Sequence, residues 1–233
     1  AFGCSFTGYR WPTWADIISW QAPQAEYHNM ARSGAGQLFI VSQLSQVINK
    51  FQPDADDLVM IMWSTFYRED RYLYGRKHQN WSTPGNIFTA QHEIPQEFVD
   101  QYVCTRGMFV RDLALIDPTM RMLSGCDFDS ISALSVGMEQ QNWTAGIAPD
   151  EQGLLDDVIE LYKPVEQYLA PSLMETQASS GWQNTYKYWD DDMQSEYEDY
   201  HPSVEHYLEY LTKLGFSSSD HVCQRVEQEH RKM

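Results

Sequence analysis

The segment from Asp57 to Trp63 constrains the fold most strongly, because every residue from Leu58 to Trp63 is apolar. A strand that is buried on both faces of a parallel sheet has this continuous pattern, whereas a half-exposed strand alternates. Residues 14–20 and 37–51, which precede it, carry apolar side chains at helical spacing. Helix alternating with strand predicts an α/β fold: a three-layer α/β/α, flavodoxin-like doubly wound parallel sheet, whose ligands bind at the carboxyl ends of the strands.

The rest of the chain extends this pattern, and its 233 residues predict one domain with one sizeable core over residues 1–233. Spacing and apolar runs predict three later elements, namely a helix at 96–123, a strand at 129–136 and a closing amphipathic helix at 204–214. Pro118 is expected to kink or divide the first of these helices. The polar, aromatic stretches 71–97 and 181–200 lack a period and predict long loops or insertions beside the site.

Composition narrows the range of partners. A formal net charge of −17 argues against binding to a nucleic-acid backbone, which needs clustered Lys and Arg. No apolar run reaches the roughly 18 residues of a membrane-spanning helix, so no membrane partner is expected. The chain shows no signal peptide, which predicts a soluble, cytoplasmic protein, and it begins with Ala1 rather than Met, so it is either processed or incomplete.

Metal or cofactor chemistry is not indicated. The four cysteines are widely spaced and form no CxxC pair, which argues against a zinc ribbon or a redox motif. The acidic patch Asp190–Asp192 has oxygen ligands that a hard cation accepts, but a solvated acidic loop is the better interpretation. We therefore expect neither a metal nor a cofactor.

Two short segments at opposite ends of the chain carry the parts of a nucleophilic hydrolase. Gly3-Cys4-Ser5 puts a serine on a small-residue turn ahead of a helix, and Glu198-Asp199-Tyr200-His201 supplies two acids and a histidine. A serine hydroxyl is a poor nucleophile until a base accepts its proton, and the oxyanion that then forms needs donors already aimed at it. Gly34, in the segment 29–36 that opens the second helix, lets a backbone N–H approach such an oxyanion closely.

These motifs resemble the SGNH, or GDSL-like, hydrolase family, particularly the branch that opens with Gly-Cys-Ser-Phe-Thr and closes with Asp-x-His-Pro-Ser. The resemblance implies that Ser5 is the nucleophile and that the N–H groups of Ser5 and Gly34 serve the oxyanion hole. It also implies that His201 is the base. The acid that orients His201 is either Glu198, three residues before it, or Asp199, two residues before it, and both stay open here.

The third of the family's sequence motifs, called the third block below, is typically Gly-x-Asn-Asp after the third strand. This chain departs from the family there. This chain has Met62-Trp63-Ser64-Thr65-Phe66-Tyr67-Arg68 there, without the asparagine that donates to the oxyanion. Ser64 or Thr65 is a possible replacement donor, and Trp63 and Arg68 are candidates for substrate binding. A missing oxyanion donor typically costs about 3 kcal/mol.

Two functions therefore follow as hypotheses. The first is an esterase that cleaves a small acyl ester or an acylated glycan, for example by removing O-acetyl groups from carbohydrate. The alternative is a catalytically weak or inactive binding module of the same fold, for example one that binds glycans. The oligomeric state is left open.

Overall fold

The computed structural model describes residues 1–73, 80–88, 94–138, 155–180, 186–190 and 195–233. Its central feature is a parallel pair of strands, β1 (Leu58–Trp63) and β4 (Asp129–Leu134), in register from Leu58↔Asp129 to Trp63↔Leu134. The side chains of β1 are buried from Val59 to Trp63. This confirms the prediction of a buried strand at this position.

Two further segments run parallel to this pair. Phe2 lies beside Ile61, and its N–H donates to the carbonyl of Met60 at 2.8 Å. On the other edge, the N–H of Ala170 donates to the carbonyl of Ser132 at 2.7 Å. Because Phe2 is level with Ile61, the turn that follows it begins near the carboxyl end of β1.

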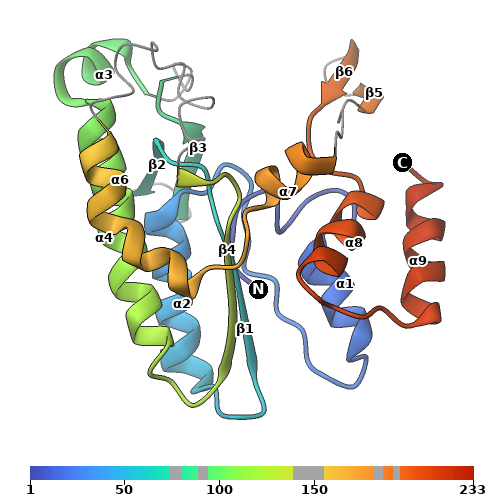
Figure 1. Cartoon of the computed structure of the whole chain (residues 1–233). Helices are drawn as coiled ribbons and strands as arrows, with labels where there is room; N and C mark the ends of the chain where they lie inside the picture. Colours follow the sequence, from blue (N-terminus) through green and yellow to red (C-terminus); the bar gives the residue numbers. More distant parts are fainter. Residues whose placement is uncertain (74–79, 89–93, 139–154, 181–185, 191–194) are drawn as a thin grey trace.

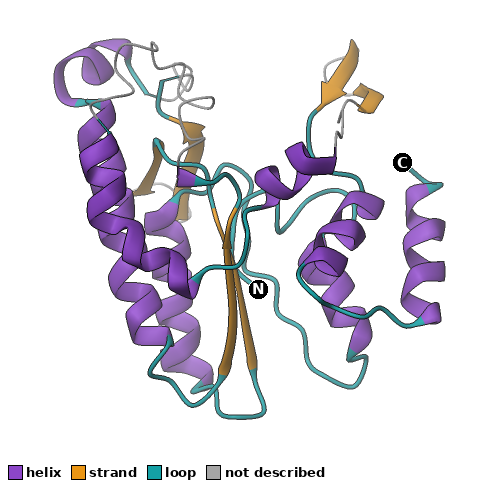
Figure 2. Cartoon of the chain, in the orientation of Figure 1, coloured by secondary structure: helices purple, strands orange, loops and turns teal. Residues whose placement is uncertain are grey.

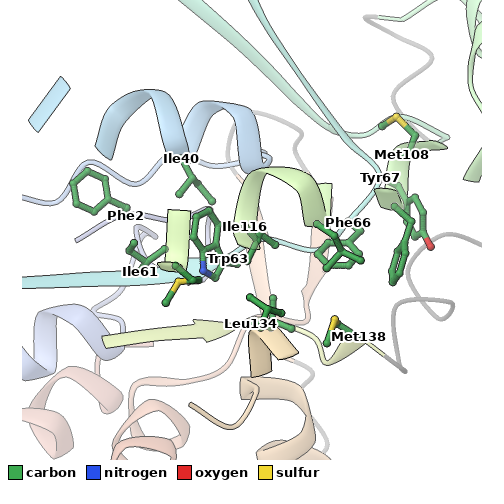
Figure 3. Close-up of a cluster of buried hydrophobic side chains, with 14 of the residues drawn as sticks. Phe2, Ile40, Ile61, Trp63, Phe66, Tyr67, Met108, Ile116, Leu134 and Met138 are labelled. Carbon is green, nitrogen blue, oxygen red and sulfur yellow. The ribbon is translucent and has the colours of Figure 1, made fainter. Parts of the chain in front are cut away.

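Helices lie on both sides of β1 and β4 (Figures 1 and 2). On one side are α2 (Gln37–Phe51), α4 (Thr105–Leu123) and α6 (Asp156–Tyr162), and on the other are α1 (Trp14–Gln21), α8 (Val204–Lys213) and α9 (Asp220–His230). Successive residues of a strand point to opposite faces. Accordingly Ile61 and Trp63 belong to one hydrophobic cluster (Figure 3), while Met60 and Met62 belong to the other. A continuous apolar strand is required because both of its faces are covered.

The expected helix at 96–123 is divided, but not at its proline. It forms α3 (Gln96–Tyr102) and α4, which are separated at Val103 and Cys104, where the backbone is extended. The Cys104 sulfur accepts a hydrogen bond from the N–H of Gly107 and so caps α4. Pro118 lies inside α4, so the prediction that it divides the helix is wrong.

The two stretches expected as long loops contain antiparallel strand pairs. Strand β2 (Arg68–Leu73) pairs with β3 (Asn80–Asn86), and β5 (Tyr186–Asp190) pairs with β6 (Ser195–Asp199). A ribbon of two strands has no second covered face, so its residues need not follow an apolar pattern. Parts of both stretches, including Asp191 and Asp192 of the acidic patch, lie outside the described residues.

A 3₁₀ helix, η3 (Lys163–Tyr168), and α7 (Leu173–Ser180) complete the described elements. The chain is thus a mixture of helix and strand around a small parallel sheet of two strands. None of the helices in the described ranges combines the length and the apolar character that crossing a membrane requires.

Candidate active site

The structure brings the two ends of the chain together at one site. The Nε2 atom of His201 lies 2.7 Å from Ser5 Oγ, and its Nδ1 atom lies 2.7 Å from Asp199 Oδ1. Ser5 is 6% exposed and Asp199 is 1% exposed, whereas the His201 side chain is 24% exposed. The three side chains therefore form a continuous hydrogen-bonded row, with its acid buried and its histidine partly open to solvent.

The hydrogen bonds determine which ring nitrogen carries the proton. An ionised carboxylate only accepts hydrogen bonds, so Nδ1 of His201 donates to Asp199 and Nε2 is left to accept from the Ser5 hydroxyl. Burial lowers the pKa of His201 below its usual value, while the hydrogen bond and charge of Asp199 act in the opposite direction. A neutral imidazole at neutral pH follows, and it is the form that can remove a proton from Ser5.

Asp199, rather than Glu198, is the acid that reaches His201. The Oδ1 atom of Asp199 accepts from both Nδ1 and the backbone N–H of His201, the latter at 2.9 Å. Glu198 is exposed, and its carboxylate accepts from the Tyr200 hydroxyl at 3.1 Å. The two acids are neighbours at the end of β6, and only the buried one is directed at the imidazole.

Sequence reasoning missed Tyr9, which contacts both His201 and Asp199. Its ring stacks on the imidazole with centroids 3.9 Å apart and planes 19° apart, and its hydroxyl donates to Asp199 Oδ2. Phe6 packs against the same imidazole at 5.1 Å. Each carboxylate oxygen of Asp199 thus accepts from a different residue, and the imidazole contacts two aromatic rings. Tyr9 is distant from His201 along the chain, so no local pattern signals this contact.

The turn that carries Ser5 is held by side chains around it. The carbonyl of Thr7 accepts from the Thr13 hydroxyl and from the Asn29 amide, each at 2.8 Å, and the Thr7 hydroxyl accepts from Trp14 at 3.2 Å. A Cβ atom on Gly3 would lie 2.3 Å from the Thr7 hydroxyl oxygen, which explains why the turn begins with glycine. These contacts fix the backbone on both sides of Ser5.

Gly34 lies in a loop that packs beside this turn. It has φ of +75°, and a Cβ atom there would lie 2.1 Å from the carbonyl oxygen of Thr83, so only glycine fits. Ala35, the next residue, shares a buried cluster with Cys4. In the part of the chain that the structure describes, neither the N–H of Ser5 nor that of Gly34 donates to a protein acceptor. Both groups are thus available to an oxyanion.

The third block, which lacks the asparagine typical of the family, is largely buried. The Gln37 side chain at the start of α2 accepts from the N–H of Ser64 at 3.2 Å and donates to its carbonyl at 2.7 Å. The Ser64 hydroxyl is buried and has no hydrogen-bond partner among the described residues. Trp63 is fully buried among core side chains (Figure 3), so the expectation that it contacts substrate is wrong. Strand alternation turns it toward the helices instead.

Thr65 and Arg68 lie closer to the surface of this block. Thr65 is 8% exposed, and its hydroxyl oxygen accepts from Nε of Arg68 at 2.8 Å, which leaves its proton to donate elsewhere. Arg68 is half-buried, and a terminal N–H donates to the carbonyl of Ala35 at 3.3 Å. Its charge also acts to lower the pKa of His201. Of the four third-block candidates, these two retain polar groups next to the Gly34 loop.

Asp70, which sequence reasoning also missed, anchors the start of α2. Its two carboxylate oxygens accept from the N–H groups of Gly36 and Phe39, both at 2.8 Å. Since α2 has no side-chain cap of its own, this buried acid from β2 satisfies two donors at its first turn. Asp70 therefore holds the Gly34 loop against the hairpin of β2 and β3.

In the described ranges, no group of three His, Cys, Asp or Glu side chains is arranged to hold a metal ion.

Comparison with known proteins finds no protein-family model, no curated protein and no solved structure that matches this chain. Any assignment of chemistry therefore depends on the geometry of Ser5, His201 and Asp199.

Proposed function

We propose that the chain is a serine hydrolase with an SGNH-like site, and that it cleaves small acyl esters, including O-acetyl groups on carbohydrate. The observation that carries this proposal is the row from Ser5 Oγ through the His201 imidazole to Asp199, with both hydrogen bonds at 2.7 Å. Nucleophile, base and orienting acid in hydrogen-bond contact are the arrangement that activates a serine hydroxyl.

In the first half of the reaction, Ser5 Oγ attacks the ester carbonyl as its proton passes to Nε2 of His201. Asp199 then stabilises the imidazolium. The carbonyl oxygen becomes an oxyanion, which accepts hydrogen bonds from the N–H groups of Ser5 and Gly34. We assign the third donor to the Thr65 hydroxyl, because its oxygen already accepts from Arg68 and its proton is left to donate elsewhere. Collapse of this intermediate expels the alcohol, which takes the proton from His201.

In the second half, His201 removes a proton from water, and the resulting hydroxide attacks the acyl group on Ser5. A second oxyanion forms in the same position and uses the same donors. The carboxylic acid leaves when His201 returns the proton to Ser5 Oγ. Tyr9 acts as a positioning residue throughout, because its ring and hydroxyl hold both partners of the His201–Asp199 pair.

The pH dependence of this mechanism follows from the lowered pKa of His201. The base works only when neutral, so kcat/KM for an ester should fall as the pH drops through that pKa. Because the folded pKa lies below the usual value of about 6.5, activity should persist to lower pH than for an unperturbed histidine.

We also propose that the sheet has the flavodoxin-like, doubly wound order, and backbone contacts support this. The carbonyls of Ala1 and Gly3 accept from the N–H groups of Met30 and Arg32, at 2.8 and 3.1 Å, on the side opposite to β1. Counted as strands together with β1 and β4, residues 30–32, residues 1–3 and the segment at Ala170 would give the strand order 2-1-3-4-5 of flavodoxin-like folds. Ser5 and Gly34 follow the first two of these rows, as a site at the carboxyl ends of the strands requires.

Turnover of p-nitrophenyl acetate by the wild type, Ser5→Ala and His201→Ala proteins tests the proposal. We expect hydrolysis by the wild type and its loss in both variants, with circular dichroism unchanged. Ser45→Ala, an exposed serine on α2, is the matched control and should hydrolyse the ester at the wild-type rate. If the wild type and Ser5→Ala were equally inactive toward a range of acyl esters, the binding module would be the better explanation.

A further inference from the structure

Arg68 is a cation held by neutral groups. Its guanidinium donates to the Thr65 hydroxyl and to the Ala35 carbonyl, and it forms no ion pair with any carboxylate in the described ranges. The chain contains 33 acidic residues against 16 Lys and Arg, so a partly buried arginine outside any ion pair is unusual here. Its charge acts on the nearby Asp70, but the carboxylate oxygens of Asp70 accept from the N–H groups of Gly36 and Phe39. Of the five N–H groups of a guanidinium, two are used by the contacts with Thr65 and Ala35.

The position of Arg68 places this charge beside the proposed nucleophile. Ala35 follows Gly34 and packs with Cys4 and Phe6, which flank Ser5. Gly36 lacks a side chain because its Cβ would lie 2.8 Å from the Cβ of Arg68. Arg68 is therefore packed directly against the loop that supplies one oxyanion donor.

A second cation, Arg10, lies beside Tyr9 near the imidazole. The guanidinium of Arg10 is 5.6 Å from the centre of the Tyr9 ring, which itself stacks on His201. The charges of Arg68 and Arg10 both act to lower the pKa of His201. Two positive charges disfavour the imidazolium that forms in the transition state, and a substrate anion bound beside Arg68 would offset that cost.

We propose that Arg68 forms an anion subsite beside Ser5, and that the preferred substrate is an ester with a carboxylate close to the scissile bond. This inference rests on the proposed function. A guanidinium and a carboxylate form strong, paired hydrogen bonds, and a fixed local cation is needed because the net charge of −17 repels anions. The bound carboxylate would also raise the pKa of His201 and strengthen it as a base.

Matched esters test the subsite. We would measure kcat/KM for meta-acetoxybenzoate, which is anionic, and for its neutral methyl ester, with the wild type, Arg68→Met and Arg121→Met. The wild type should prefer the anionic ester by at least about tenfold, and Arg68→Met should lose about 10- to 100-fold more activity on it than on the neutral ester. Arg121 is an exposed arginine on α4, so Arg121→Met removes the same charge and should keep the wild-type preference. An equal loss on both esters in Arg68→Met would overturn the subsite and make Arg68 an oxyanion donor.

A binding measurement separates this inference from the proposed function. In Ser5→Ala, NMR titration of His201 with and without benzoate should show a higher pKa in its presence, and Ser5→Ala/Arg68→Met should show no rise. Absence of a benzoate effect in Ser5→Ala would overturn the subsite whatever the turnover. An intact benzoate effect without hydrolysis of either ester by the wild type would overturn only the proposed hydrolysis.

Discussion

Asp199→Asn is the substitution whose effect can be worked out most fully from the contacts. Asp199 Oδ1 accepts from two N–H groups of His201, and Oδ2 accepts from the Tyr9 hydroxyl. An asparagine amide can satisfy all of these only with its oxygen toward His201 and its NH₂ toward Tyr9, whose hydroxyl would rotate to accept. The imidazole would therefore keep its tautomer, and the substitution would remove the charge alone.

The charge sets the size of the effect. Two unit charges about 4 Å apart attract by about 4 kcal/mol at an effective dielectric constant of 20. Losing this stabilisation of the imidazolium should lower kcat/KM by about 10³-fold. That is less than the roughly 10⁴-fold loss found where an amide traps the wrong tautomer. Because Asp199 acts to raise the pKa of His201, the remaining activity should also fall away at a lower pH than in the wild type.

The assay is kcat/KM for p-nitrophenyl acetate across the acidic pH range, with Glu198→Gln as the matched control. Glu198 is the adjacent acid, but its contact is with Tyr200, so its variant should keep the wild-type rate and pH profile. An Asp199→Asn protein with wild-type activity, or a Glu198→Gln protein that loses as much, would refute this reasoning.

Three further substitutions test the surroundings of the site. Tyr9→Phe keeps the ring stacked on His201 but removes the hydroxyl that donates to Asp199, so kcat/KM should fall by about 10- to 100-fold. Tyr9→Leu also removes the stacked ring and should lower kcat/KM further. Equal activity of Tyr9→Phe and the wild type would contradict the positioning role. Gly34→Ala should lower the free energy of unfolding by more than about 2 kcal/mol in urea titrations, because its Cβ meets the Thr83 carbonyl. Gly85→Ala, at φ of +91° but with only an ordinary contact to the Gly34 Cα at 4.0 Å, should cost about 1–2 kcal/mol, and the reverse order would disprove the clash. Asp70→Ala leaves the N–H groups of Gly36 and Phe39 buried without acceptors, and it should lower the free energy of unfolding by about 2–4 kcal/mol. Asp117→Ala on α4, the control, should lower it by less than about 1 kcal/mol. Similar values for the two variants would argue against the cap.

Ser5 and His201, the proposed nucleophile and base, could be selected from the sequence because their signals are local. A small-residue turn before a helical pattern marks Ser5, and acids beside a histidine before another helical pattern mark His201. No local sequence signal distinguishes Glu198 from Asp199 as the acid that contacts His201. The choice depends on β6 reaching Asp199, because neighbouring strand residues face opposite sides and only one of these acids turns inward.

Contacts between distant parts of the chain could not be predicted from local sequence patterns. Tyr9 meets Asp199 across 190 residues, and Asp70 caps a helix that begins 33 residues earlier, at Gln37. For Trp63, in contrast, the sequence analysis predicted a substrate contact that its burial rules out. An aromatic residue at the end of a strand suggested a surface for substrate, but the alternation that places Ile61 in the core places Trp63 there as well.

Within the fold, burial determined what could be predicted. The pattern of β1 was recognised because helices cover both of its faces. The hairpins of β2 with β3 and of β5 with β6 carry no continuous apolar run, so their segments resemble loops in sequence. The helix break at Val103 and Cys104 was missed because the apolar spacing continues across it.

Labelling with a fluorophosphonate probe, followed by mass spectrometry of the peptides, tests the central claim most directly. A serine activated by His201 should react to give a single adduct on Ser5. The adduct should be absent from Ser5→Ala and strongly reduced in His201→Ala, and it should form at the wild-type rate in Ser45→Ala. An unlabelled wild-type protein, or equal labelling of the wild type and Ser5→Ala, would contradict the account.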